Sequence, residues 1–129
     1  MSDKPTRAQI ADPTSHYGSP KASTRHFITQ RVTGALNVLF TLFLVWLVVN
    51  LAGAERAAMV ATIANPLVAL VLLLLIVNVV IHMRNGMRDV IEDYFEGELN
   101  RLALAANTGF ALLVALIALG SIAKIVFWG

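Results

Sequence analysis

Three long apolar runs dominate the 129-residue chain, and most polar residues lie before the first run or in the connections. The runs extend from Val32 to Ala54, from Pro66 to Met87 and from Leu102 to Val126. About 20 helical residues cross a hydrocarbon core of about 30 Å, and each run is long enough. The alternating pattern of a membrane barrel is absent from the sequence. The pattern therefore predicts an all-α membrane protein with three transmembrane helices, at about 31–54, 66–93 and 101–127.

Residues 1–25 are polar and contain three of the four prolines, so we expect a polar N-terminal tail before a membrane domain over residues 26–129. The length of this stretch, and the lack of a small-residue cleavage site after the first apolar run, argue against a secretory signal peptide. Asp3, Asp12 and the prolines argue against an Arg-rich mitochondrial presequence. We therefore expect the inner membrane of a bacterium rather than that of a mitochondrion.

Composition supports lipid as the surrounding medium. Apolar residues make up 57% of the chain and charged residues 14%, against about a quarter charged in soluble domains. Eight of the ten Lys and Arg residues lie before or at the start of the first run, or near the connection between the second and third. The positive-inside bias then predicts an inner N-terminus and an outer C-terminus. The basic residues flank apolar runs, so the net charge of +2 does not indicate nucleic-acid binding.

The second run contains ionisable residues that lipid disfavours. Its apolar core, from Leu67 to Ile81, is about 15 residues long, so a full span must also include His82 and Arg84. Gly86, one turn beyond His82, leaves room for a flat ligand, and a neutral imidazole is a common axial ligand of haem iron. The same residues have simpler alternatives: His82 in a hydrogen bond between helices, Gly86 in close packing, and Arg84 reaching the lipid head groups.

Polar residues also gather at the predicted inner face. Arg31 begins the first helix, where its guanidinium could pair with a haem propionate or serve only as a topology signal. The chain has no cysteine, so any iron–sulfur cluster must belong to a partner. After His82, acidic residues are interleaved with apolar ones, which fits a solvated helix face or a docking surface for a soluble partner: Asp89, Glu92, Asp93, Glu96 and Glu98.

The segment from His82 to Tyr94, HMRNGMRDVIEDY, resembles the second-helix motif of the D-type membrane anchor of succinate dehydrogenase. That motif has a His, then a Gly, a Val and an Asp-Tyr pair at the same spacing. Residues 30–34, QRVTG, resemble the start of helix one in both anchors of that enzyme, which is Arg-x-Thr or Arg-x-Ser. Part of the motif is also similar to the other anchor, the C-type. The Asp93-Tyr94 pair, and the lack of a His immediately before Arg31, favour the D-type.

Carried onto this chain, the resemblance implies that His82 is one axial ligand of haem b, with Arg31 and Gly86 beside the haem. It also implies that Tyr94 and Asp93 bind ubiquinone. A C-type sister anchor would supply the second haem ligand and complete a helical bundle. An iron–sulfur subunit and a flavoprotein subunit would hold the iron–sulfur clusters and FAD.

The anchor would have no active site for succinate. It would pass electrons from the iron–sulfur subunit to quinone in the respiratory chain and the tricarboxylic acid cycle. A fumarate reductase anchor shares this scaffold and is the nearest alternative. A non-redox membrane protein, such as a transporter subunit or an assembly factor, is the alternative from a different class.

Overall fold

The computed structural model describes residues 20–129, and the first 19 residues of the predicted tail lie outside the described residues. The described chain forms four helices: α3 (Pro20–Leu51), α4 (Arg56–Ala64), α5 (Pro66–Tyr94) and α6 (Gly97–Trp128). Three of them, α3, α5 and α6, are long and apolar enough to cross a membrane, with mean hydropathies of 2.3, 2.7 and 2.5 over their apolar cores. They confirm the predicted all-α membrane fold with three candidate spans.

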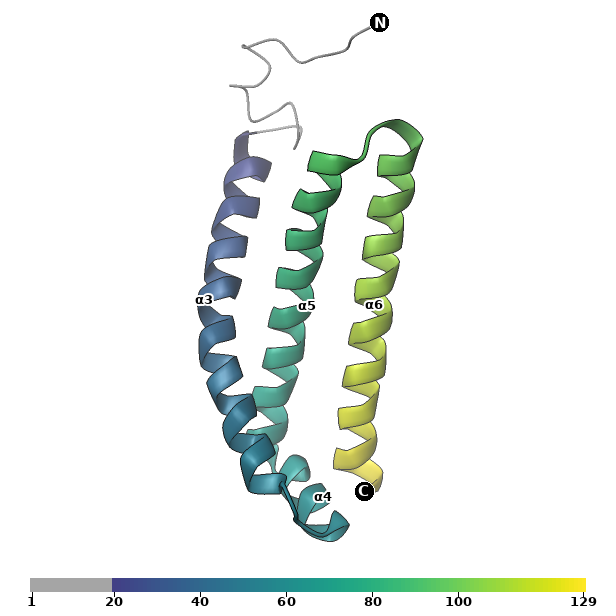
Figure 1. Ribbon diagram of the computed structural model, residues 1–129. Coiled ribbons are helices and arrows are strands. Elements are labelled where there is room, and N and C mark those ends of the chain that lie inside the picture. The colour runs from purple at the N-terminus through teal and green to yellow at the C-terminus, as the bar shows by residue number, and fades with distance from the viewer. Residues whose placement is uncertain (1–19) are drawn as a thin grey trace, which may run out of the picture.

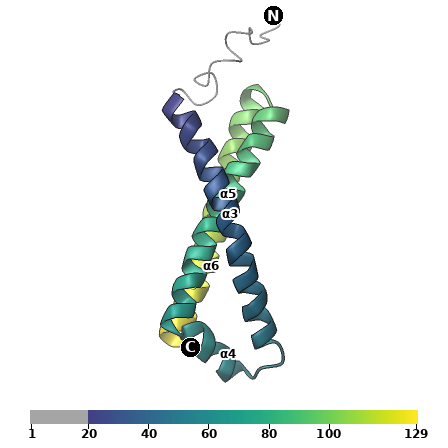
Figure 2. The same cartoon turned by 90° about the vertical axis from the view of Figure 1, so that its left-hand side faces the viewer.

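The three long helices form a single layer, with α5 between α3 and α6 (Figure 1). From the side, α3 crosses α5 and the two helices diverge towards both ends (Figure 2). Such a layer buries little surface, and large apolar side chains stay exposed on all three helices. Lipid or further transmembrane helices, rather than water, suit these outer faces. The buried apolar residues of the described chain are few: Leu47, Ala69, Leu72, Leu75, Ile91 and Ala111.

Helix α5 carries five of the nine buried residues of the described chain. Four of them follow one another at intervals of three: Ala69, Leu72, Leu75 and Asn78. From the first to the last of these is about two and a half turns, so they pass from one side of the helix to the other, as suits a helix between two neighbours. The helix begins at Pro66, where the missing N–H leaves no helical hydrogen bond unmade. Asn65 caps this end, because its Oδ1 accepts hydrogen bonds at 3.0 and 3.4 Å from the backbone N–H groups two and three residues on.

The first helix begins earlier than expected. The sequence suggested a polar tail up to residue 25 and a helix from about 31, whereas α3 runs from Pro20 to Leu51. A helix of 32 residues is about 48 Å long and extends beyond a hydrocarbon core of about 30 Å. The apolar pattern located only the part that meets lipid. Its polar first turns are helical because they contact α5, as in the 2.7 Å contact of His26 Nε2 with Asp89 Oδ1.

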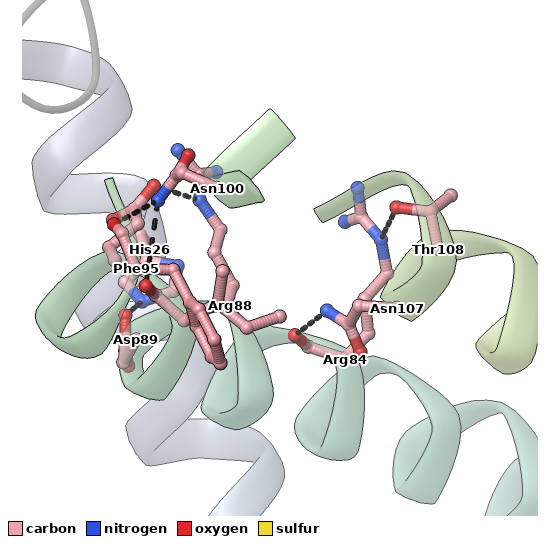
Figure 3. Close-up of polar contacts among 10 residues, drawn as sticks. His26, Arg84, Arg88, Asp89, Phe95, Asn100, Asn107 and Thr108 are labelled. Carbon is pink, nitrogen blue, oxygen red and sulfur yellow. Dashed lines mark hydrogen bonds and ion pairs between the residues drawn. The ribbon is translucent and has the colours of Figure 1, made fainter. Parts of the chain in front are cut away.

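The two connections also differ from the expectation. The first contains α4, which the apolar pattern did not predict and which packs against the ends of α5 and α6 (Figure 1). The second is short, because α6 begins at Gly97 rather than near residue 101. Gly97 has a φ of +60°, a conformation that favours glycine and lets the chain reverse. Asn100 Nδ2 then donates to the backbone oxygen of Phe95 at 3.0 Å and closes the turn (Figure 3).

Candidate functional site

A line of polar contacts joins α3 to α5, and we term its members the polar seam: Gln30, Thr33, Asn37, Asn78 and His82. Asn78 is buried and donates from Nδ2 to the backbone oxygen of Thr33 at 2.9 Å and to Asn37 Oδ1 at 2.6 Å. His82 follows one turn later on the same side of α5. Lipid offers no hydrogen-bond partners, so these contacts hold α3 and α5 in one relative position.

The imidazole of His82 is held at its Nδ1 edge, 3.0 Å from Thr33 Oγ1. The same hydroxyl lies 2.7 and 3.3 Å from the backbone oxygens of Thr29 and Gln30. A hydroxyl has one proton, and these two carbonyls can only accept it. Thr33 therefore donates within its own helix and accepts from His82, which assigns the proton of the neutral imidazole to Nδ1.

The other ring nitrogen of His82 is available to a ligand. Nε2 has no hydrogen-bond partner among the residues that the structure describes. Over residues 20–129, the one buried side-chain nitrogen or oxygen without a partner is Gln30 Oε1. The Nε2 atom of His82 is therefore not buried, and it is accessible from outside the helix layer. No three His, Cys, Asp or Glu residues cluster around a metal position in this part of the chain.

Two glycines determine how closely α3 and α5 approach. A Cβ at Gly34 would be 3.2 Å from His82 Cε1 and 3.8 Å from its Nδ1, so glycine is what lets the ring lie against α3. A Cβ at Gly86 would be 3.2 Å from Gln30 Nε2. The space beside Gly86, where the sequence suggested room for a flat ligand, is therefore occupied by the Gln30 amide.

Arg84 faces α6 rather than the polar seam. Its Nε donates to Thr108 Oγ1 at 3.1 Å (Figure 3). The buried Asn107 donates from Nδ2 to the backbone oxygen of Arg84 at 2.9 Å. The sequence suggested the lipid head groups as the partner of Arg84, and the structure adds a hydroxyl of the neighbouring helix. These contacts join α5 to α6 as the polar seam joins α5 to α3.

An open cavity of about 550 Å³ lies between the first turns of α3 and the last turns of α5. His26 Nε2 and Asp89 Oδ1 meet across it at 2.7 Å (Figure 3). The Arg31 guanidinium lies 4.6 Å from the centre of the Phe27 ring, one turn back along α3. The cavity is open and has an acidic side on α5 opposite the arginine on α3. Its polar lining consists of Ser23, His26, Gln30, Arg31, Asp89, Glu92 and Asp93.

The structure brings some of the predicted site residues together and separates others. Arg31 and Asp93 line the same cavity. Tyr94 ends α5 with 80% of its surface exposed and is not part of that lining. His82 lies deeper in the layer, because eleven residues before Asp93 correspond to about 16 Å of helix. The chain therefore offers an imidazole inside the layer and a polar cavity at one end of it.

Sequence reasoning missed the residues that support His82. Thr33 and Gly34 were noted only as parts of a motif, and Asn37 was not considered. One signal was visible, because Asn78 interrupts an otherwise apolar run one turn before His82. A buried amide there requires a partner on a neighbouring helix. The pattern did not say which helix would supply it.

The fold and these contacts define a class of protein: a multi-pass helical membrane protein that offers one accessible imidazole from its interior. The family model described as succinate dehydrogenase/fumarate reductase transmembrane subunit matches residues 5–123. The chain belongs to this family and is thus a membrane subunit of an oxidoreductase complex with other subunits. This favours the anchor over the transporter subunit or assembly factor. Neither a curated protein nor a solved structure matches the chain.

Proposed function

We propose that this chain is the D-type anchor of a succinate:quinone oxidoreductase in a bacterial inner membrane. Membership of the transmembrane-subunit family supports the anchor role. The Asp93-Tyr94 pair that ends α5 supports the D-type over the C-type sister anchor. The observation that carries the redox part of the proposal is the His82 imidazole, whose Nδ1 contacts Thr33 Oγ1 and whose Nε2 has no partner among the described residues.

His82 is the proposed axial ligand of haem b, through Nε2. The apolar runs of this chain contain no second His, so a second protein ligand of the haem would come from the sister anchor that completes the helical bundle. The bound haem would supply a one-electron carrier inside the membrane. Arg31, whose guanidinium can bind a carboxylate with two parallel hydrogen bonds, is the proposed partner of the haem propionates. The Gln30 amide occupies the space beside Gly86, so Gly86 is given no direct haem contact.

Ubiquinone is proposed to bind at the cavity end of α5. The Tyr94 phenol can donate a hydrogen bond to a quinone carbonyl, and Asp93 can accept one from the reduced form. The quinone takes two electrons, delivered singly by the iron–sulfur subunit, and two protons from the inner aqueous phase. The exposure of Tyr94 supports a site that is completed by a partner covering this end. The iron–sulfur subunit is the proposed cover, with the flavoprotein subunit attached to it.

The cavity end is proposed to face the inner compartment. It carries the first turns of α3 and the connection between α5 and α6. Eight of the ten Lys and Arg residues lie in or before the first turns of α3, or in the last turns of α5 and the first turns of α6. Positive residues are retained on the inner side of membranes. The short α4 and the C-terminus of the chain then lie on the outer side.

The first test is a visible spectrum of the complex, purified through a tag on this chain, taken as dithionite-reduced minus oxidised. We expect a b-type haem band in the wild type and its loss or alteration in His82→Ala. His26→Ala is the matched control, since its ring contacts Asp89 at the helix end, and it should keep the band. A wild-type complex without a haem band would overturn the haem assignment.

The quinone assignment has a separate test. Tyr94→Phe removes one hydroxyl from an exposed ring and leaves the fold intact. We expect it to lower succinate-to-quinone activity, while electron transfer from succinate to a soluble dye stays at the wild-type rate. The dye is reduced without the membrane quinone site, so it serves as the internal control. Equal losses in the two assays, or no loss in either, would contradict the role of Tyr94.

A further inference from the structure

We propose that Thr33 is a positioning residue for the haem ligand, which fixes the tautomer of His82 and so sets the reduction potential of the bound haem. The inference rests on the proposed function, because it requires haem at His82. It concerns a residue of α3, whereas the ligand itself is on α5.

The Thr33 hydroxyl can donate only one hydrogen bond. It has one proton and two lone pairs, and the proton is used in the 2.7 Å hydrogen bond to the backbone oxygen of Thr29. Only a lone pair is left to meet His82 Nδ1 at 3.0 Å. The contact is favourable when Nδ1 carries the hydrogen and unfavourable when it does not. Thr33 therefore selects the tautomer whose Nε2 can bind iron.

The packing around Thr33 keeps its hydroxyl next to the His82 ring. Thr33 and Asn78 are each 7% exposed. Asn78 donates to the backbone oxygen of Thr33 at 2.9 Å and so holds this residue against α5. On the next residue, Gly34, any Cβ would approach His82 Cε1 to 3.2 Å. The His82 ring thus lies between the Thr33 hydroxyl and the backbone of Gly34, which has no side chain. In this partly buried position a hydrogen bond is stronger than in water.

The contact between Thr33 Oγ1 and His82 Nδ1 would also affect the electron density at a bound haem iron. An acceptor on the Nδ1 hydrogen makes the imidazole a stronger donor through Nε2, and outer partners of this kind tune metal sites. A stronger donor favours the oxidised iron and lowers the potential. A neutral hydroxyl is a weaker acceptor than a carboxylate, so its effect is smaller than that of a carboxylate partner. Loss of the hydroxyl should move the haem midpoint potential to more positive values and loosen the ring orientation.

The test uses the intact complex with three variants of this chain. Thr33→Val keeps the shape and removes the hydroxyl, whereas Thr33→Ser keeps the hydroxyl. Thr41→Val makes the same change at an exposed position of α3, away from the polar seam. The readouts are the haem midpoint potential from a redox titration and the low-temperature electron paramagnetic resonance spectrum of the oxidised haem.

We expect a positive shift of the potential and a changed resonance spectrum in Thr33→Val, with wild-type values in Thr33→Ser and Thr41→Val. Loss of haem from Thr33→Val but not from Thr33→Ser would support the same role. A haem-loaded Thr33→Val complex with unchanged potential and spectrum would overturn the inference and leave the haem assignment standing. Equal effects in all three variants, or haem loss in Thr33→Ser, would also overturn it. A wild-type complex without haem would overturn the proposed function itself.

Discussion

The hydrogen bonds of Asn78 allow a quantitative test of how α3 and α5 are held together. Asn78→Leu keeps a side chain of similar size and removes both contacts, to the Thr33 backbone oxygen and to Asn37 Oδ1. Hydrogen bonds between transmembrane helices contribute about 0.6 kcal/mol each on average. Two such bonds give about 1.2 kcal/mol, which is roughly a sevenfold change in the equilibrium between packed and separated helices.

The assay is a titration with a denaturing detergent, followed by energy transfer between dyes on α3 and α5. The chain has no cysteine, so one cysteine introduced in the first turns of α3 and one in the last turns of α5 label specifically. Asn50→Leu is the matched control. Asn50 is an exposed amide that donates at 2.7 Å to the backbone oxygen of Trp46 in its own helix, so its loss should leave the transition unchanged. An Asn78→Leu transition at the wild-type midpoint, or an equal shift in Asn50→Leu, would refute the reasoning.

Three further changes test other contacts. Gly34→Ala places a methyl group 3.2 Å from His82 Cε1, so the ring must shift by a few tenths of an ångström; a haem resonance spectrum identical to the wild type would contradict this. His26→Leu removes the 2.7 Å contact with Asp89 and should speed amide hydrogen exchange in residues 20–30, and unchanged exchange there would show that the contact is not stabilising. Asn107→Leu should weaken the α5–α6 pair by about 0.6 kcal/mol in the detergent titration, with dyes on those helices, and an unshifted midpoint would count against that contact.

The membrane fold could be predicted because a span through lipid needs a continuous apolar segment, and such a segment is visible in the sequence itself. About 20 apolar residues are needed for a span, and the three runs meet that need. The first turns of α3 and the whole of α4 escaped this criterion. Both contact other helices, and such contacts are not visible in the apolar pattern of a single segment.

The candidate site divides in a similar way. His82 could be singled out because an ionisable side chain in an apolar span calls for a reason. Thr33 and Gly34 could not, since which residues of α3 face the imidazole depends on how the two helices are rotated about their axes. That rotation is determined by packing, including the amide of Asn78. A pattern along one helix contains no information about the orientation of the other.

The single-layer arrangement bears on the survival of newly made chains. With α3 and α6 on opposite sides of α5, each pair of spans is joined by few buried apolar residues and a few hydrogen bonds. A chain without its partner subunits should therefore open frequently between its helices, and open chains are cleaved by proteases. The cellular amount of this chain should then follow the supply of the subunits that cover the layer, whatever its own rate of synthesis.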